Sequence, residues 1–324
     1  MLNRKLLSLA VLIVAGVAGC GVSPQLADSS PVDPSGEPEA STGETAFQEE
    51  EPEGSPVQLT SFQAAKSRHA MRKLDELILF QPAKYPAGDW SPRGLNFRDV
   101  ELESADGTKL HAWFCPAENP RASVLYLHGN AGHLANRADF LKVLQQDLRV
   151  DVLIVDYRGY GKSEGKSTID GAIADVRAAS RELASRTGLK EDELIVWGRS
   201  LGGALAVQLA AQTQPRGVIL HSSFSSLKET AAEHFPKLAW MVGKKRLNSA
   251  EKIAQYKGAV LQCHGTNDRV ISFASGKRLH EAANEPKEFL TLEGQGHNDR
   301  VSTDFLRATD AFISRLTGTD RALR

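Results

Sequence analysis

Residues 194–206 read Leu-Ile-Val-Trp-Gly-Arg-Ser-Leu-Gly-Gly-Ala-Leu-Ala. The first four are apolar, as in a strand buried on both faces, and the last residues favour a helix. Between them lies a Gly-x-Ser-x-Gly pattern centred on Ser200. A sharp turn from strand to helix would expose the serine hydroxyl, and the flanking glycines would let strand and helix approach closely. The stretch predicts a nucleophilic serine; the alternative is a glycine-rich turn that only packs the helix on the strand.

Apolar runs on both sides of this stretch predict a sheet. The expected strands are Ala122 to Leu127, Val152 to Val155, Leu194 to Trp197, Val218 to Leu220, Ala259 to Cys263 and Glu288 to Leu292. The expected helices are Leu134 to Leu148, Ile169 to Ser185, Leu201 to Gln212, Gly276 to Ala283 and Asp304 to Leu316. Before them, the Asp106-Gly107 turn predicts an antiparallel hairpin. This alternation is typical of an α/β fold with a doubly wound, mostly parallel sheet.

Polar loops follow two of the later strands, where binding groups gather in such sheets. Asp268 closes the first loop and His297 closes the second. A serine hydroxyl needs an imidazole to take its proton, and the imidazole needs a carboxylate to orient it. We therefore predict that His297 acts on Ser200 and that Asp268 orients His297. Asp299 and Glu293 are alternatives for the acid, and a turn or capping role is the alternative for both predicted residues.

A tetrahedral intermediate also needs donors for its oxyanion. The Leu201 amide follows the nucleophile at the start of a helix, and the Asn130 amide lies in the loop His128-Gly129-Asn130-Ala131-Gly132 after an earlier strand. We expect these two amides to form the oxyanion hole, with a plain flexible connection as the alternative for the loop. His128 and His264 each precede a glycine at a strand end, and we expect them to be packed and hydrogen-bonded.

These motifs together resemble the alpha/beta-hydrolase family, and within it the group of protein depalmitoylases, their bacterial relatives and serine aminopeptidases. The resemblance covers residues 79–299. It rests on Phe80-Gln81-Pro82, Asp106-Gly107, His128-Gly129-Asn130-Ala131-Gly132, Asp156-Tyr157-Arg158-Gly159-Tyr160-Gly161, Gly198-Arg199-Ser200-Leu201-Gly202-Gly203 and Gly296-His297-Asn298-Asp299. It implies an alpha/beta-hydrolase fold and a serine hydrolase. His221 stands where an acid or amide is expected, and Ser272 where a proline often occurs.

The stretch from Asp156 to Gly161 also precedes two Gly-Lys-Ser triplets, which suggest a phosphate-binding loop. That loop needs a glycine five residues before the Gly-Lys pair, and Asp156 and Tyr160 occupy those positions. We instead expect a structural turn in which Asp156 and Arg158 hold neighbouring loops. The spacing His-Glu-x-x-His is absent, so we expect hydrolysis without a metal or cofactor.

The amino terminus has the features of a targeting segment. Two basic residues are followed by the apolar run Leu6 to Ala18 and by Val17-Ala18-Gly19-Cys20, which resembles a bacterial lipobox. We expect a signal peptide at residues 1–19 and a lipid on Cys20, with an ordinary cleaved signal or a short anchor as alternatives. The chain is then exported to the cell envelope and anchored to a membrane by its lipid; Gly21 favours transfer to an outer membrane where the cell has one.

The next segment, residues 20–63, is acidic and rich in Pro, Ser and Glu. Because it offers little to bury, we expect a disordered linker. The hydrolase domain is expected at residues 64–324, with a short lid at 227–257 whose apolar side could line an acyl pocket or pack on the core. The basic residues 244–246 within it are expected to form a solvated edge.

The whole chain has 324 residues, 41% of them hydrophobic, and a net charge of −1. It shows no basic stripe with stacking aromatics, so we do not expect a nucleic-acid partner. Besides Cys20, the cysteines are Cys115 and Cys263 in apolar runs, which we expect to be buried free thiols, with a disulfide as the alternative.

We expect hydrolysis of an ester or thioester of a small molecule or an acylated protein, through an acyl-enzyme. A serine aminopeptidase-like peptidase is the second hypothesis, and a lipid-anchored binding protein with a vestigial triad is the third.

Overall fold

The computed structural model describes residues 76, 79–237, 239–243 and 245–318. All belong to the unit His69–Arg324. The predicted signal peptide, acidic linker and Cys20 lie outside the described residues. No helix in the described ranges has both the length and the apolar character needed to cross a membrane.

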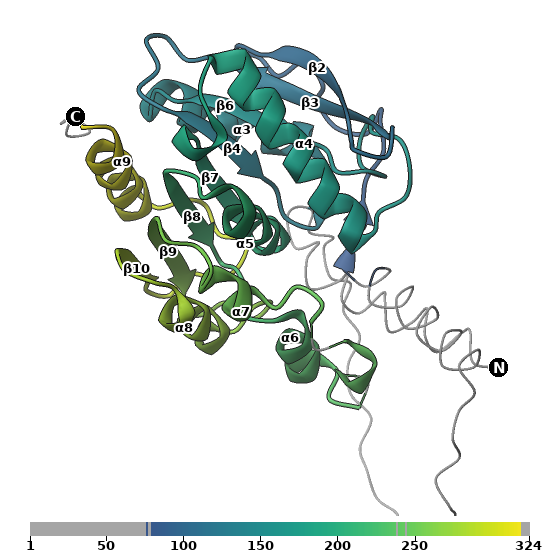
Figure 1. Ribbon diagram of the computed structural model, residues 1–324, viewed down its shortest axis with the longest axis vertical. Helices are drawn as coiled ribbons and strands as arrows, with labels where there is room; N and C mark the ends of the chain where they lie inside the picture. Colours follow the sequence, from purple (N-terminus) through teal and green to yellow (C-terminus); the bar gives the residue numbers. More distant parts are fainter. Residues whose placement is uncertain (1–75, 77–78, 238, 244, 319–324) are drawn as a thin grey trace, which may run out of the picture. The chain divides into compact units, whose positions relative to one another are not determined.

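The centre of the fold is an eight-stranded sheet in the order β10-β9-β8-β7-β4-β6-β3-β2 (Figure 1). Its strands are β2 (Arg98–Glu103), β3 (Lys109–Cys115), β4 (Ser123–Leu127), β6 (Asp151–Val155), β7 (Ile195–Arg199), β8 (Gly217–His221), β9 (Ala259–Gly265) and β10 (Lys287–Leu292). The strands from β6 to β10 in this order pair in parallel, whereas β2 and β3 form the predicted antiparallel hairpin. The predicted fold class is therefore confirmed.

Helices cover both faces of the sheet, because its central strands are apolar on both sides. One apolar core includes residues of α4 (Ile169–Thr187), α5 (Leu201–Thr213), α7 (Ser249–Ile253) and α8 (Phe273–Ala282). The other includes residues of α3 (Ala138–Lys142) and α9 (Thr303–Thr317). In Figure 1, α4 and α5 lie in front of the strands. This is the doubly wound arrangement that the sequence predicts.

The helix expected from Leu134 to Leu148 is not uniform. It starts with a 3-10 turn at Leu134–Arg137, continues as α3, and ends in a π turn at Val143–Asp147. The buried side chain of Gln145 in the π turn bonds the main chain of Asn96 and Pro116. The predicted helical stretch is therefore confirmed, although its hydrogen-bond pattern changes from 3-10 to α to π along its length.

A small second sheet lies beside the main one and was not predicted. It pairs β1 (Gln81–Pro82) with β5 (Ala131–Gly132) in parallel. The Gln81 amide also donates to the carbonyl of Asn130, at 3.2 Å. The start of the described chain thereby lies against the loop that carries a predicted oxyanion donor.

The predicted lid, residues 227–257, contains α6 (Leu227–His234), a 3-10 turn at Ala239–Met241, and α7. Ala239 is buried, whereas the neighbouring Trp240 is 69% exposed. Arg246 is not the solvated residue that we expected, because it forms an ion pair of 2.9 Å with Glu76, and both side chains are 15% exposed. This pair joins the lid segment to the start of the described domain.

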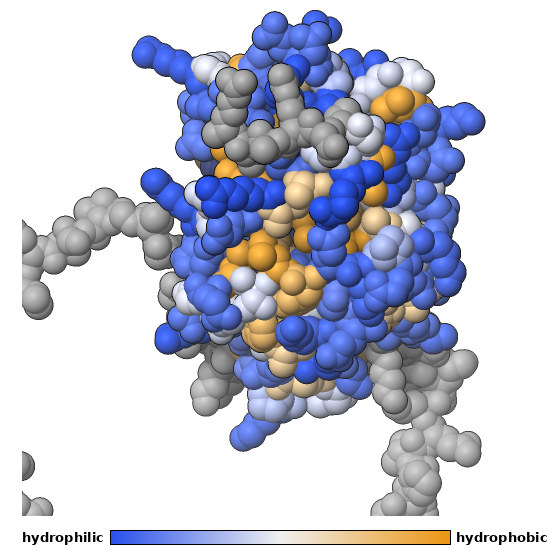
Figure 2. All heavy atoms as spheres, turned by 90° about the vertical axis from the view of Figure 1, so that its left-hand side faces the viewer, coloured by the Kyte–Doolittle hydropathy of each residue, from blue (hydrophilic) through white to orange (hydrophobic). Residues whose placement is uncertain are grey.

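Figure 2 shows the side of the molecule on which β10 and α9 lie. Apolar residues gather in the middle of this face and polar residues border them. Strand β10 is an edge of the main sheet, and Phe289 and Leu290 within it are only partly buried. The sheet therefore ends here in a partly apolar strand.

Candidate active site

Ser200 occupies a strained turn between β7 and α5. Its φ of 54° and ψ of −119° lie outside the conformations that non-glycine residues ordinarily adopt. The surroundings hold it there: its amide donates to the carbonyl of His221 at 2.9 Å, and its carbonyl accepts from Ser223 Oγ at 3.1 Å. This is the sharp turn that the sequence predicts, and strain of this kind is typical of functional sites.

Two glycines make this turn sterically feasible. A Cβ atom on Gly198 would lie 2.2 Å from the carbonyl oxygen of Gly202. A Cβ atom on Gly202 would lie 2.0 Å from the carbonyl oxygen of Leu127. Both contacts are with main chain, which cannot move aside cheaply, so the pattern around Ser200 requires glycine for close approach of strand and helix.

Asp268 and His297 are joined by a hydrogen bond. Oδ2 of Asp268 lies 2.7 Å from Nδ1 of His297. The other carboxylate oxygen accepts the amides of Val270, at 2.9 Å, and Ile271, at 2.8 Å. Asp268 is buried, so its orientation is fixed from both sides. The alternative acid Asp299 instead accepts the amide of Gly296 within its own loop.

Asp268 keeps its negative charge despite its burial. Burial alone would raise the pKa of Asp268, but hydrogen bonds from His264 and His297 outweigh it and lower this pKa well below its ordinary value. A carboxylate beside Nδ1 favours the imidazole tautomer with hydrogen on Nδ1, which leaves Nε2 free to accept a proton. The pair therefore has the electrostatics of a general base and its orienting acid.

His264 contacts the carboxylate of Asp268 as well. Its Nε2 donates to the carbonyl of Ile271 at 2.9 Å and lies 3.4 Å from Oδ2 of Asp268. The ring is fully buried. His128 is also fully buried, and its Nδ1 lies 2.7 Å from the carbonyl oxygen of Gly129. The expectation that both histidines are packed and hydrogen-bonded is confirmed.

The structure brings the histidine to the serine's strand, but it does not join their side chains. In the described part of the chain, no hydrogen bond links the Ser200 hydroxyl to His297. Arg199, however, donates from Nη2 to the carbonyl oxygen of His297 at 2.6 Å. Catalytic hydrogen bonds are often long in structures without substrate, and they tighten in the complex. Ser200 and His297 therefore both lie after the carboxyl ends of strands in the main sheet.

The predicted oxyanion donors lie on two sides of Ser200. Leu201 is the first residue of α5, so its amide has no partner within the helix. On the other side, a Cβ atom built on Gly129 would lie 3.7 Å from Cβ of Ser200. Asn130 follows directly; its carbonyl accepts hydrogen bonds from Gln81 and Tyr160, whereas no hydrogen bond among the described residues uses its amide as donor. Both predicted amides therefore remain candidates for binding an oxyanion.

Two buried tyrosines hold the loop that contains Asn130. Tyr157 donates from its hydroxyl to the carbonyl of His128 at 2.8 Å, and Tyr160 donates to the carbonyl of Asn130 at 2.6 Å. The ring of Tyr157 also stacks on His128, with centroids 4.4 Å apart. We did not assign these tyrosines a role from sequence, although the Asp-Tyr-Arg-Gly-Tyr-Gly motif that contains them was visible.

Asp156 and Arg158 hold neighbouring loops, as predicted. Oδ1 of Asp156 accepts the amide of Leu134 at 2.7 Å, and burial raises the pKa of Asp156 to about 7. Arg158 bonds the carboxylates of Asp175, at 2.8 Å, and Asp106, at 2.7 Å. These contacts use the groups for structure, which confirms the interpretation of this stretch as a turn.

His221 is the last residue of β8. It is buried, and its ring packs on Phe305 with centroids 4.8 Å apart. Burial, together with the positive charge of Arg199, lowers the pKa of His221 well below its ordinary value, so the ring is neutral. Cys115 and Cys263 are buried free thiols, as expected. Ser272, the other departure from the family pattern, accepts the Ser275 amide and caps α8.

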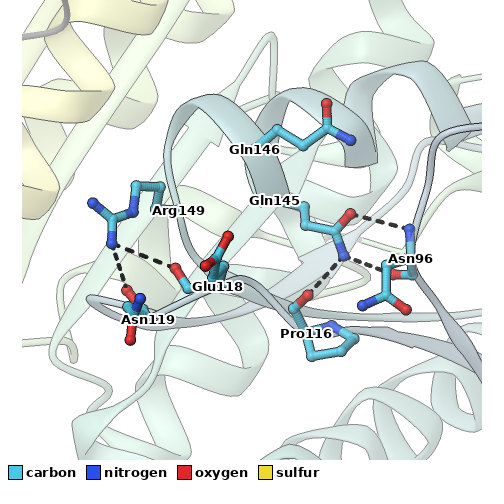
Figure 3. Close-up of a pocket in the computed structure, with 7 residues that line it drawn as sticks. All are labelled: Asn96, Pro116, Glu118, Asn119, Gln145, Gln146 and Arg149. Atoms are coloured by element: carbon cyan, nitrogen blue, oxygen red, sulfur yellow. Dashed lines mark hydrogen bonds between the residues drawn. The ribbon is translucent and has the colours of Figure 1, made fainter.

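A separate pocket of about 480 Å³ lies away from this site. It is lined by Asn96, Pro116, Glu118, Asn119, Gln145, Gln146 and Arg149 (Figure 3). Asn96 precedes β2, and the other residues lie in the segments before β4 and β6, so the pocket is at the opposite ends of the strands from Ser200. Gln145 and Arg149 bond main-chain carbonyls around the pocket, so they brace loops rather than face a ligand. Among the described residues, no group of three or more His, Cys, Asp or Glu side chains could hold a metal ion.

Comparison with known families and relatives identifies the family to which this fold belongs. The family model described as "Serine aminopeptidase, S33" matches residues 118–252. An uncharacterized protein of Mycobacterium tuberculosis is 37% identical over 228 residues, which cover 68% of this chain and 80% of that protein. Human alpha/beta hydrolase domain-containing protein 17B is 34% identical over 198 residues, which cover 61% of this chain and 68% of that protein.

Solved structures show the same fold at low sequence identity. The esterase Pf2001 of Pyrococcus furiosus has a TM-score of 0.62 and 20% identity, and the match covers 74% of this chain and 98% of that one. A puromycin-hydrolyzing peptidase of Mycobacterium tuberculosis has a TM-score of 0.56 and 19% identity, and the match covers 71% of this chain and 41% of that one.

Proposed function

The chain belongs to the alpha/beta-hydrolase family, and we propose that it is a serine hydrolase that cleaves a carboxylic ester or thioester through an acyl-enzyme. One observation carries the proposal. The buried carboxylate of Asp268 orients His297, and the main chain of His297 is bonded to Arg199, the residue next to a strained Ser200. In this arrangement Ser200 would be the nucleophile, His297 the base and Asp268 the orienting acid, all at the carboxyl ends of the parallel strands.

In the proposed reaction, Oγ of Ser200 attacks the acyl carbon while Nε2 of His297 takes the hydroxyl proton. The amides of Leu201 and Asn130 stabilise the oxyanion of the tetrahedral intermediate. When the intermediate collapses, the bond to the leaving alkoxide or thiolate breaks, and His297 returns the proton to that group. Water then attacks the acyl-enzyme with His297 again as base, which releases the carboxylic acid and restores Ser200.

Asp268 contributes through its charge. Its low pKa keeps the carboxylate ionised while His297 becomes an imidazolium, so the positive charge forms beside a negative one. Because Asp268 is buried, this interaction is screened less by water and salt than a surface pair.

A peptidase is the second candidate. The matching family model is described as a serine aminopeptidase, and one structural neighbour is described as a puromycin-hydrolyzing peptidase. We favour the ester or thioester because a neighbour with a higher TM-score is described as an esterase. The residues around Ser200 serve either chemistry.

A substrate panel tests the proposal. It contains p-nitrophenyl esters of increasing acyl length, matched acyl thioesters and aminoacyl anilides. We expect the esters or thioesters to be cleaved, with loss of activity in Ser200→Ala. Ser249→Ala is the control, because the Ser249 hydroxyl is buried without a hydrogen-bond partner. Activity that survives in Ser200→Ala would contradict the proposal, and turnover confined to anilides would establish the peptidase. If no substrate is cleaved and no activity probe reacts, a binding protein with a vestigial triad is favoured.

We also propose that the chain is exported to the cell envelope and anchored to a membrane by lipid on Cys20, with the acidic linker as a spacer. The support is the basic and apolar start that ends in Val17-Ala18-Gly19-Cys20. An acylated protein or a small acyl ester at a membrane is then the substrate. Metabolic labelling with a palmitate analogue should mark the wild type but not Cys20→Ala, and label that persists in the variant would refute the anchor.

A further inference from the structure

Arg199 connects the strand of the nucleophile to the loop of the predicted base. It is the last residue of β7 and directly precedes Ser200. Its Nη2 donates to the carbonyl oxygen of His297 at 2.6 Å. We propose that Arg199 is a positioning residue that sets the separation of Ser200 and His297 for proton transfer. This inference rests on the proposed hydrolase function.

The other bonds of the histidine loop, residues 293–301, fix mainly its first half. Asn267 donates from its amide to the carbonyl of Gln295 at 3.0 Å, and from Nδ2 to the carbonyl of Gly294 at 3.2 Å. The Gly296 amide donates to Asp299 at 2.7 Å. Within the described residues, the bond from Arg199 is the one hydrogen bond that reaches the main chain of His297. The position of this residue along the loop therefore depends on Arg199.

Two fixed points determine where the imidazole lies. Asp268 holds the ring through Nδ1, and Arg199 holds the main chain of the same residue. Without the second point, the ring could still bond Asp268 while Nε2 moved away from Ser200. A misplacement of about 1 Å can cost about a hundredfold in rate, because proton transfer needs a short and aligned contact.

Arginine suits this role. Its guanidinium remains charged at any physiological pH, and a hydrogen bond from a charged donor is stronger than a neutral one. Among the described residues, no ion pair joins Arg199 to an acidic side chain, and the side chain of Arg199 donates its hydrogen bond to the carbonyl of His297. Its partner in the sheet register is His221, which is neutral and packed on Phe305. Within the described part of the chain, the one hydrogen bond of its side chain is directed to the histidine loop.

Kinetics of Arg199→Met and Arg199→Lys test the role. We expect kcat to fall about tenfold to a hundredfold in the Met variant, with KM within about twofold of the wild type, since the bond acts on the chemical step. The Lys variant should regain part of kcat, because an ammonium group can also donate to a carbonyl. Arg216→Met is the matched control, since Arg216 pairs with Glu193 at 3.7 Å just before β8.

Amide hydrogen exchange tests the same role without any substrate. Residues 293–301 should exchange faster in Arg199→Met than in the wild type, in Arg199→Lys and in Ser200→Ala. Unchanged exchange with unchanged kcat would overturn the proposal. The proposal would also be overturned if Arg199→Met lowered kcat, raised KM and lowered the melting temperature together, and if Arg199→Lys showed the same changes. If the wild type cleaves no substrate, the proposed function fails, whereas the exchange result still decides whether Arg199 holds the loop.

Discussion

The hydroxyl of Tyr160 donates a hydrogen bond of 2.6 Å to the main-chain carbonyl of Asn130. This bond fixes the peptide group between Asn130 and Ala131. The amide of Asn130, on the other side of the same Cα atom, is a proposed oxyanion donor. Tyr160 is buried, so the bond is protected from water. The orientation of the loop that contains Asn130 therefore depends on a side chain thirty positions further along the chain.

Tyr160→Phe should lower kcat about threefold to tenfold, the equivalent of one ordinary hydrogen bond, because the loop loses its anchor. Tyr256→Phe is the matched control, since the buried Tyr256 hydroxyl donates to the carbonyl of Pro215 at 2.7 Å near the opposite edge of the sheet. Thermal unfolding should show similar losses of stability in both variants. An equal effect of both variants on kcat would contradict a role of Tyr160 in the site.

Asp268→Asn should lower kcat by about three to four orders of magnitude, because the amide cannot stabilise the imidazolium or enforce its tautomer. The asparagine oxygen can still accept the amides of Val270 and Ile271, so the melting temperature should change little. Asp268→Ala removes those acceptors and should lose stability as well as activity. Near-normal turnover in Asp268→Asn would assign the acid to another residue.

Gly202→Ala should destabilise the domain by roughly 3 kcal/mol or more, since overpacking against main chain cannot relax without shifting the strand. The added Cβ would lie 2.0 Å from the carbonyl oxygen of Leu127. Gly129→Ala is the control, because its nearest contacts would be 3.7 Å away. Urea unfolding distinguishes the two, and equal free energies of unfolding would show that the turn between β7 and α5 tolerates a Cβ atom at Gly202.

Asp156 should make stability depend on pH. Burial raises the pKa of Asp156 to about 7 in the folded state, whereas an unfolded aspartate has a pKa of about 3.9. The folded state therefore binds the extra proton, and this stabilisation is complete below about pH 4 and is lost as the pH rises through about 7. The groups around the carboxyl are His128, Arg137, Lys84 and Lys162.

The test compares wild type with Asp156→Asn. The free energy of unfolding of the wild type, relative to the variant, should fall between pH 5 and pH 8. The comparison removes the opposite contribution of His128, whose pKa burial lowers to about 3. A difference between the two proteins that stays constant over this range would show that Asp156 does not carry the proton.

The sequence was sufficient to predict the parallel strands of the sheet and to predict which strands the three site residues follow. The apolar runs at β4, β7 and β8 are long enough to identify buried strands, and parallel strands bring their carboxyl ends to one edge. Ser200, Asp268 and His297 follow β7, β9 and β10, so topology alone places all three at the carboxyl ends of parallel strands. The joining of Asp268 and His297 agrees with that reasoning.

The contacts that orient the loops could not be predicted. Tyr157, Tyr160 and Arg199 act through main-chain carbonyls far away in sequence, and no local pattern specifies which carbonyl a side chain reaches. Arg246 lies in a basic run typical of a solvated surface, yet it pairs with Glu76 across the domain. The pairing of β1 with β5 involves too few residues to leave a periodic signal.

The most direct test of the account is the site of labelling by a fluorophosphonate probe, which reacts only with an activated serine. Peptide mass spectrometry of the labelled wild-type protein should find one modified residue, Ser200. Labelling should disappear in Ser200→Ala and become much slower in His297→Ala. A label on another serine, or a folded wild-type protein that does not react, would contradict the claim that Ser200 is the activated nucleophile.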